Sequence, residues 1–191
     1  MVRVSPEIQS EKDELRSYLK TLGRASSSEG HDGSPGFSAL KQFLKKTQGI
    51  WGAFVALSSE PSVAETCQEM NHLQWAFPRI EGDAMEFRNV ADPTREENFE
   101  KISFGIWQPK KEFPVVEKKQ LAGVLVPGLA FDRKGGRIGR GKGHYDRFLA
   151  DLSLIKIGVL FSQRLLEKIP RDGFDITMDY IVTEKEMIAT R

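Results

Sequence analysis

Apolar side chains recur at helical spacing in two segments near the start of the chain. In residues 6–22 these positions are Ile8, Leu15, Tyr18, Leu19 and Leu22. Ser5 before Pro6 is a typical helix start, so the pattern predicts a helix over residues 6–22. A similar pattern predicts a second helix over residues 37–48. The Gly- and Ser-rich residues 23–36 between them predict a flexible connection.

From residue 50 onward, short apolar runs alternate with polar turns, which is the pattern of strands alternating with helices. The expected strands are residues 51–57, 73–77, 85–89, 123–126, 156–161 and 180–182. The expected helices between them are residues 62–71, 144–152 and 163–168. Residues 105–119, with prolines, lysines and little periodicity, predict a surface loop.

Two of these runs decide the fold class. Residues 123–126 and 157–161 are apolar throughout, as in strands buried on both faces of a parallel sheet. The chain has 191 residues, of which 39% are hydrophobic, near the usual size of one domain. The sequence therefore predicts one domain over residues 1–191 with an α/β layered, Rossmann-like fold, in which helices flank a mostly parallel central sheet.

Composition limits the partners that we expect. The 28 Lys and Arg nearly balance the 27 Asp and Glu, so the whole molecule attracts neither nucleic acid nor an anionic membrane strongly, and an anion site must be local. A single cysteine, Cys67, allows no internal disulfide. No signal-peptide core and no apolar run of roughly 18 residues is present, so we expect a cytoplasmic protein without a membrane partner.

One segment carries a pattern that fits a phosphate group. Residues 126–149 follow an expected buried strand and precede an expected helix, and ligands usually bind at this junction in an open α/β sheet. Gly139, Gly141 and Gly143 alternate with Arg140 and Lys142. Backbone amides can then approach an anion while two cations neutralise it. The segment is not a P-loop, because Gly-x-x-x-x-Gly-Lys-Ser/Thr does not occur.

Glycines at this spacing often mark only a turn, and the bare repeat favours that explanation. The neighbouring residues favour a polyphosphate site instead. Pro127 and Gly128 end the strand, Asp132 follows, and Arg137 offers a planar guanidinium that matches phosphate.

The run from Pro127 to Asp146 resembles the signature of 5-formyltetrahydrofolate cyclo-ligases, also called 5,10-methenyltetrahydrofolate synthetases. Their pattern reads Pro-Gly-Leu-x-Phe-Asp-x-x-Gly-x-Arg-Leu-Gly-x-Gly-x-Gly-Tyr-Tyr-Asp, and here Ile138 replaces the later Leu and His144 replaces the first Tyr. Other parts of the pattern occur in the same order, namely Lys12-x-x-Leu15-Arg16, Pro78-Arg79-Ile80, Met85-x-Phe87, Gly105-Ile106-x-x-Pro109 and Asp175-x-x-x-Asp179-x-Ile181-Val182-Thr183. The resemblance therefore spans almost the full chain.

This resemblance implies a monomeric α/β enzyme that uses ATP and Mg²⁺ to convert 5-formyltetrahydrofolate into 5,10-methenyltetrahydrofolate, ADP and phosphate. The formyl oxygen is expected to be phosphorylated first, after which the neighbouring folate nitrogen attacks the activated carbon. Such phosphoryl transfer depends mainly on positioning and charge neutralisation.

The resemblance also implies roles for individual residues. ATP would be bound by Lys12, Arg16, Arg137, Gly139, Arg140, Gly141, Lys142, Gly143, His144, Tyr145 and Asp146. Catalysis would depend on Arg140, Lys142 and Tyr145. The folate would contact Leu57, Ser62, Trp107, His144 and Tyr145. Mg²⁺, which prefers oxygen ligands, would be held by Asp146 and Asp179.

Taken alone, several of these residues have simpler explanations. Lys12 and Arg16, four residues apart, fit a solvated helix face. Asp146 fits an acid that stabilises a helix start. Tyr145 can belong to the core, and the His144 ring can simply pack beside the turn.

Two positions depart from the family pattern. Ser62 stands where the family usually has Glu before Val or Ile, and serine cannot supply that charge, although Glu60 and Glu65 lie nearby. His144 is smaller than tyrosine and titrates near neutral pH. Both changes concern the folate side, so a diverged nucleotide- or folate-binding relative with weak or no turnover is an alternative. A nucleic-acid-binding patch at residues 133–147 is a further alternative. The overall charge balance and the lack of aromatic residues interleaved with the basic ones argue against it.

Overall fold

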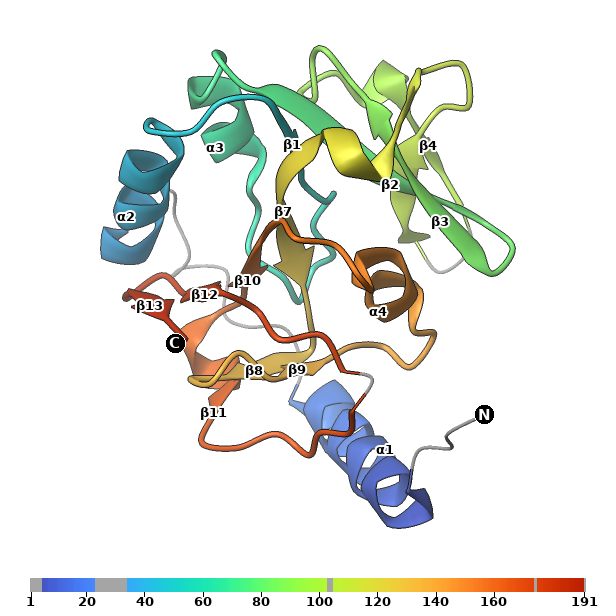
Figure 1. The fold of residues 1–191 in the computed structure, drawn as a ribbon, viewed down its shortest axis with the longest axis vertical. Helices are drawn as coiled ribbons and strands as arrows, with labels where there is room; N and C mark the ends of the chain where they lie inside the picture. Colours follow the sequence, from blue (N-terminus) through green and yellow to red (C-terminus); the bar gives the residue numbers. More distant parts are fainter. Residues whose placement is uncertain (1–4, 23–33, 103–104, 174, 191) are drawn as a thin grey trace.

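An eight-stranded sheet forms the centre of the computed structural model (Figure 1), which describes residues 5–22, 34–102, 105–173 and 175–190. The strands of this sheet are β1 Ile50–Gly52, β2 Gln74–Glu81, β3 Ala84–Asn89, β6 Val115–Val116, β7 Leu121–Pro127, β10 Ile155–Val159, β12 Tyr180–Val182 and β13 Met187–Ala189. They lie across the sheet in the order β13-β12-β10-β7-β1-β2-β3-β6.

The direction of the strands locates a ligand site. The middle strands β12, β10, β7, β1 and β2 run parallel, whereas β13, β3 and β6 pair antiparallel at the edges. The chain leaves β1 toward β2 on one side and leaves β7 toward β10 on the other. Because β1 and β7 are neighbours, the topological switch point lies between them, where open α/β sheets usually bind ligands.

Helices cover both faces of this sheet. The α-helices are α1 Pro6–Thr21, α2 Pro35–Leu44, α3 Ala64–Glu69 and α4 His144–Leu149. On one face α2 and α3 share a buried cluster with Trp51 and Leu125, and on the other Phe148 of α4 packs with Val124 and Val126. The predicted α/β layered fold, with helices flanking a mostly parallel central sheet, is confirmed.

Two small sheets extend this core. One contains β8 Ala130–Asp132, β9 Arg137–Ile138 and β11 Leu165–Leu166, and the other contains β4 Phe99–Lys101 and β5 Trp107–Pro109. α1 packs on the first of them, where Leu15 and Leu19 meet Ile138 and Leu166. Figure 1 shows α1 below β9, so the first helix lies beside the segment that leads into α4. None of the helices in the described ranges is long and apolar enough to cross a membrane.

Several predicted boundaries need correction. Residues 163–168 are not a helix, because a 3₁₀ turn at Ser162–Arg164 leads into β11, which pairs with β8. The expected loop over residues 105–119 contains β5 and β6. The expected strand over residues 51–57 leaves the sheet after Gly52. Of the expected flexible connection, residues 23–33 lie outside the described residues.

Candidate functional site

The glycine-rich turn, residues 139–143, follows β9 and leads into α4. Gly141 and Gly143 have φ angles of +95° and +66°, which L side chains rarely adopt, so the path of the turn depends on glycine. Arg16 reaches the turn from α1, because its Nε donates a hydrogen bond to the carbonyl oxygen of Gly139 at 3.1 Å. The structure therefore brings Arg16 to the turn, and its role in ATP binding stays a prediction.

The hairpin before the turn is fixed by a buried aspartate that sequence analysis gave no specific role. Asp132 is 1% exposed. Its Oδ1 accepts hydrogen bonds from the backbone N–H groups of Lys134 and Gly136 at 2.9 and 2.8 Å, and its Oδ2 accepts one from Ile169 at 3.0 Å. A buried charge needs such partners, so Asp132 ties the β8–β9 hairpin to the segment after β11.

Lys12 contacts the segment after β11, whereas Arg16 contacts the glycine-rich turn. Its ammonium is buried and forms ion pairs with Asp172 at 2.7 Å and Asp175 at 2.5 Å. Burial alone would lower the pKa of Lys12, but the hydrogen bonds and charges of the two aspartates raise it above its ordinary value of 10.5. To reach a nucleotide phosphate, Lys12 must exchange these partners.

Arg137 and Asp146 form a hydrogen-bonded ion pair. Nη2 of Arg137 donates to both carboxylate oxygens of Asp146, at 2.9 and 2.8 Å, and Nη1 donates to the carbonyl oxygen of Pro127 at 3.4 Å. The guanidinium carbon lies 5.6 Å from the centre of the Tyr145 ring. Arg137 is 6% exposed at its side chain, against 31% for Asp146, so the carboxylate still faces solvent on one side.

Arg140 joins the turn to the loop that follows β1. Its Nη2 donates to Oγ of Ser59 and to Oε1 of Glu60, both at 3.2 Å. Since β1 and β7 are neighbours with outgoing connections on opposite sides, this ion pair lies across the switch point of the sheet. In the sequence Glu60 stands out only as a neighbour of Ser62, because an ion pair between residues 80 positions apart leaves no local pattern.

Lys142 and His144 have different surroundings. Lys142 is exposed, and among the described residues its ammonium has no hydrogen bond or ion pair. His144 lies near the β2–β3 turn, where burial and then the charge of Arg147 lower its pKa, opposed by Asp83 and by a backbone hydrogen bond to Gly82. The histidine ring is therefore held largely in its neutral form at pH 7.

The hydroxyl of Tyr145 is buried and has no hydrogen-bond partner among the described residues. Burial, followed by the nearby charge of Glu60, raises the pKa of Tyr145, while Arg137 opposes this shift. The phenol therefore stays protonated at any physiological pH. Unpartnered buried hydroxyls are uncommon in proteins, and a ligand is one way to satisfy them.

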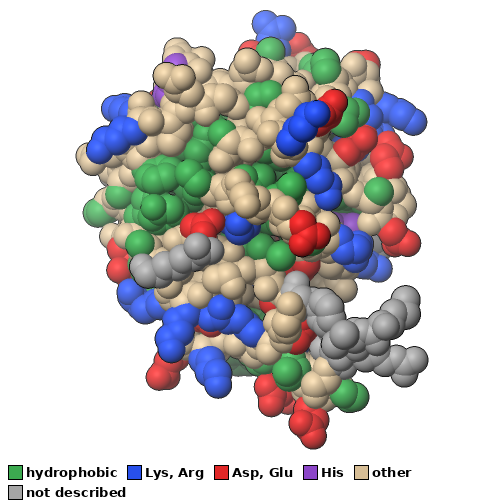
Figure 2. All heavy atoms as spheres, in the orientation of Figure 1, with side chains coloured by type: hydrophobic (Ala, Val, Ile, Leu, Met, Phe, Trp, Pro, Cys, Tyr) green, Lys and Arg blue, Asp and Glu red, His purple; other side chains and the backbone are tan. Residues whose placement is uncertain are grey.

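A cavity of about 320 Å³ lies at the loop after β1. Its lining residues are Phe54, Val55, Ala56, Leu57, Ser58, Glu60, Ser62, Ala64, Phe77 and Pro93. Leu57 and Ser62, both expected to contact folate, thus share one cavity. In Figure 2 hydrophobic side chains gather between α2, α3 and β7, and Lys and Arg side chains gather below them over the small sheet of β8, β9 and β11.

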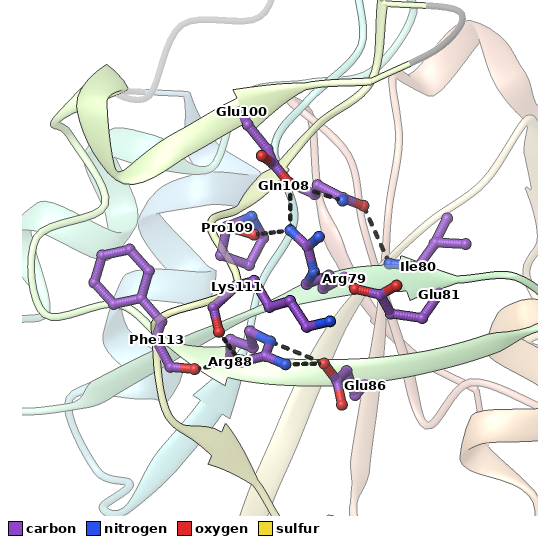
Figure 3. A network of polar contacts seen from close by, with 10 residues as sticks. All are labelled: Arg79, Ile80, Glu81, Glu86, Arg88, Glu100, Gln108, Pro109, Lys111 and Phe113. Atoms are coloured by element: carbon purple, nitrogen blue, oxygen red, sulfur yellow. Dashed lines mark hydrogen bonds and ion pairs between the residues drawn. The ribbon is translucent and has the colours of Figure 1, made fainter.

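Trp107, the remaining residue expected to contact folate, lies on β5 and packs against the buried cluster that also contains Phe54 and Phe77. It does not line the cavity in this structure. Figure 3 shows what holds its hairpin: Nη1 of Arg79 in β2 donates to Glu100 of β4 at 2.5 Å and to the carbonyl oxygen of Pro109 in β5 at 2.8 Å.

A second buried arginine completes this network. Arg88 of β3 pairs with Glu86 and donates to the carbonyl oxygens of Lys111 and Phe113, which fixes the segment after β5 (Figure 3). Arg88 is 8% exposed. The sequence alone assigns no role to Arg88, because a hydrophobicity pattern treats every arginine as a surface residue.

The two expected magnesium ligands lie at different places. Asp146 pairs with Arg137 near the carboxyl end of β7. Asp179 lies directly before β12, at the amino end of that strand, where its Oδ2 accepts a hydrogen bond from the backbone N–H of Lys156 at 2.9 Å. No group of three or more His, Cys, Asp or Glu side chains suited to a metal ion occurs among the described residues.

Together, the fold and the site define a doubly wound α/β protein with a basic, glycine-rich turn beside a largely apolar cavity. The sequence model of the 5-formyltetrahydrofolate cyclo-ligase family matches residues 8–184. The chain belongs to this family, which confirms the resemblance and the class of enzyme expected from the sequence.

Individual relatives agree with this membership. A probable 5-formyltetrahydrofolate cyclo-ligase of Caenorhabditis elegans is 29% identical over 199 residues, covering 93% of this chain and 94% of the relative. The 5,10-methenyltetrahydrofolate synthetase of Aquifex aeolicus has a similar solved structure, with a TM-score of 0.76, 30% identity and coverage of 94% and 93%. A Mycoplasma pneumoniae structure at 21% identity, with a TM-score of 0.69 and coverage of 92% and 99%, supports the fold.

Proposed function

We propose that this enzyme converts 5-formyltetrahydrofolate and ATP into 5,10-methenyltetrahydrofolate, ADP and phosphate, as one domain over residues 1–191. The observation that carries the proposal is the ion pair between Arg140 and Glu60. It holds the basic turn, which suits a polyphosphate, next to the cavity, which suits a flat and largely apolar group. Names of relatives from several organisms agree with this activity.

In the nucleotide half, Lys142 is exposed within the turn, and its ammonium has no ion pair in the part of the chain that the structure describes. Arg16 is held at the turn by the carbonyl oxygen of Gly139, and Arg140 is 43% exposed at its side chain. Each also has a carboxylate partner, Asp13 for Arg16 and Glu60 for Arg140. A guanidinium has five N–H donors, so both keep donors that can serve a phosphate. Lys12 and Arg137 are almost entirely buried in their ion pairs, so we propose that their contribution to nucleotide binding follows an exchange of partners.

Magnesium would act with the nucleotide. The carboxylate of Asp146 is partly exposed, which fits an ion that keeps several waters and takes one or two protein carboxylates together with phosphate oxygens. We therefore assign Asp146 to the ion. Asp179 already accepts a backbone hydrogen bond at the amino end of β12. When bound, the ion would neutralise charge on the phosphates.

The proposed reaction needs little chemistry from side chains. The formyl oxygen attacks the γ-phosphorus of ATP and ADP leaves. The second folate nitrogen then attacks the formyl carbon, loses its proton, and phosphate departs with the former formyl oxygen. The cations of the turn stabilise the transferring phosphoryl group, and the Tyr145 hydroxyl lies at the boundary between the two halves. Positioning and charge neutralisation of this kind account for most phosphoryl-transfer catalysis.

The test is a direct assay of purified protein with 5-formyltetrahydrofolate, Mg²⁺ and ATP, following the absorbance of the methenyl product. We expect product with ATP and none when ATP is omitted. A folded protein that binds either substrate but makes no product at high enzyme concentration would support the diverged binding relative instead. Gel filtration tests the accompanying proposal of a monomer, and fractionation of cells tests the proposed cytoplasmic location.

A further inference from the structure

Arg147, an exposed residue of α4, joins the glycine-rich turn to the tip of the β2–β3 hairpin. Its Nη1 donates a hydrogen bond to the carbonyl oxygen of Lys142 at 2.9 Å, and its Nη2 donates one to the carbonyl oxygen of Asp83 at 3.0 Å. α4 and β3 lie side by side (Figure 1). One guanidinium thus connects two loops that are far apart in the sequence.

The tip of the hairpin is a firm support. β2 and β3 pair as far as Glu81 and Ala84, so Gly82 and Asp83 form a tight two-residue turn. β2 also pairs with β1 in the central sheet. The ring of His144, at the start of α4, has a hydrogen bond to the backbone of Gly82 in the same tip. Two side chains of α4 therefore attach the start of this helix to the hairpin.

Arg147 also fixes one peptide plane of the glycine-rich turn. The described peptide bonds are all trans, and in a trans peptide the C=O and the following N–H point in opposite directions. Because the carbonyl of Lys142 faces Arg147, the N–H of Gly143 points away from the guanidinium. A Cβ atom on Gly143 would lie only 2.7 Å from Nη1 of Arg147, so the contact requires glycine at this position.

Arg16 acts in the same way at the other end of the turn. Its Nε binds the carbonyl oxygen of Gly139, so the N–H of Arg140 points away from Arg16. Among the described residues, the N–H groups of residues 140–143 donate to no backbone carbonyl. The turn thus has carbonyl oxygens bound by arginines and N–H groups left open, and open N–H groups in a turn favour an anion.

On the basis of the proposed function, we propose that Arg147 is a positioning residue for the phosphates of ATP. It acts through the carbonyl of Lys142, which it holds away from the ligand, so that the N–H of Gly143 is oriented to donate to a phosphate oxygen. Without Arg147, the glycines at 141 and 143 leave these peptide planes free to rotate. Donors that are already oriented bind more tightly than donors that must first be ordered.

The experiment compares Arg147→Met with Arg133→Met, because Arg133 is likewise exposed but donates to the carboxylate of Glu186. Titration calorimetry measures the binding of ADP with Mg²⁺, and rate assays measure KM for both substrates. We expect Arg147→Met to weaken ADP binding and raise the KM for ATP about 10-fold, with the KM for 5-formyltetrahydrofolate within about twofold, as for one lost hydrogen bond to a charged group. Arg133→Met should change none of these values.

Two further measurements separate positioning from charge. Arg147→Lys keeps the charge but lacks the planar fork that spans two carbonyl groups, so its ADP affinity should stay at least about 3-fold below that of wild type. This variant also serves if Arg147→Met does not fold. In amide NMR spectra of wild type, bound ADP should move the Gly143 amide proton downfield, and the movement should be smaller in Arg147→Lys.

Three results would overturn the positioning role alone. They are wild-type ADP affinity in Arg147→Met, wild-type ADP affinity in Arg147→Lys, and a Gly143 amide that bound ADP leaves unchanged in wild type. Wild-type protein that binds no nucleotide would overturn the proposed function and this inference together.

Discussion

One nitrogen of the Arg137 guanidinium contacts both carboxylate oxygens of Asp146, at 2.9 and 2.8 Å. Arg137 is almost entirely buried, whereas Asp146 is partly exposed to water. The charge of the arginine therefore depends on this ion pair for its compensation more than the charge of the aspartate does. The pair also fixes the start of α4 relative to β9, the two elements on either side of the glycine-rich turn.

Removing the arginine should reduce stability. We expect Arg137→Gln to lower the free energy of unfolding by about 2 kcal/mol, as for hydrogen bonds to charged groups. Arg133→Gln is the control, because its ion pair with Glu186 is exposed and should contribute less than about 0.5 kcal/mol. Urea denaturation measures both. Equal effects of the two substitutions would contradict the stabilising role of the buried pair.

The two expected magnesium ligands should behave differently. Asp146→Asn should raise the Mg²⁺ concentration for half-maximal rate about 10-fold or more. Asp179→Asn should leave that value unchanged and instead lower the melting temperature, because the carboxylate also pairs with the Lys156 ammonium at 3.6 Å and an amide cannot replace that charge. A rate assay over a range of Mg²⁺ concentrations checks this. A common shift in both variants would return Asp179 to the metal site.

Lys142 should contribute to ATP use without contributing to stability. Its ammonium has no partner among the described residues, so Lys142→Ala should change the free energy of unfolding by less than about 0.5 kcal/mol. Loss of a charged phosphate contact should raise the KM for ATP or lower turnover by about 10- to 100-fold. Lys134→Ala, on the β8–β9 hairpin, is the matched control. An unchanged ATP dependence in Lys142→Ala would exclude the turn as the phosphate site.

Lys12 should be costly to remove. Lys12→Met leaves Asp172 and Asp175 without their shared cation, and breaking a buried ion pair in this way typically costs about 3–5 kcal/mol. Because the folded pKa of Lys12 is raised above 10.5, its contribution is fully present below about pH 10 and is lost as pH rises through the folded value. Thermal unfolding between neutral and strongly alkaline pH should therefore differ between wild type and Lys12→Met. If the melting temperatures of wild type and Lys12→Met changed with pH in parallel, this prediction would be contradicted.

His144 should make the protein less stable in mild acid. Its folded pKa lies below the ordinary value of 6.5, so the unfolded chain takes up a proton at higher pH than the folded chain. Stability should therefore fall as pH drops below about 6.5. His144→Gln should reduce this dependence, as measured by melting temperatures between pH 5 and 8. If stability fell more steeply with decreasing pH in His144→Gln than in wild type, the pKa shift of His144 would have the opposite sign.

The core strands were predictable because their signal is local. β7 and β10 are buried on both faces, so apolar runs marked them despite Lys156. The helix predicted over residues 163–168 was wrong because Leu165, Leu166 and Ile169 fit helical spacing equally well. In the structure these leucines belong to β11, whose partner β8 lies more than 30 residues earlier in the chain.

The site was predictable only in part, because only some of its residues leave a local signal in the sequence. The turn and its cations are contiguous in sequence, and Arg16 was reached through the family pattern. The ion pair of Glu60 and the burial of Arg79 and Arg88 depend on chain segments that meet only after folding. No spacing rule records such contacts.

The ion pair between Arg140 and Glu60 makes the loop after β1 and the glycine-rich turn after β9 thermodynamically dependent on each other. A nucleotide that draws Arg140 away changes the charge facing the cavity, and a ligand that occupies Glu60 changes the freedom of Arg140. By linkage, each ligand then alters the affinity of the other by the same factor. A cooperative or antagonistic order of substrate binding would thus originate in one half-buried ion pair across the centre of the sheet.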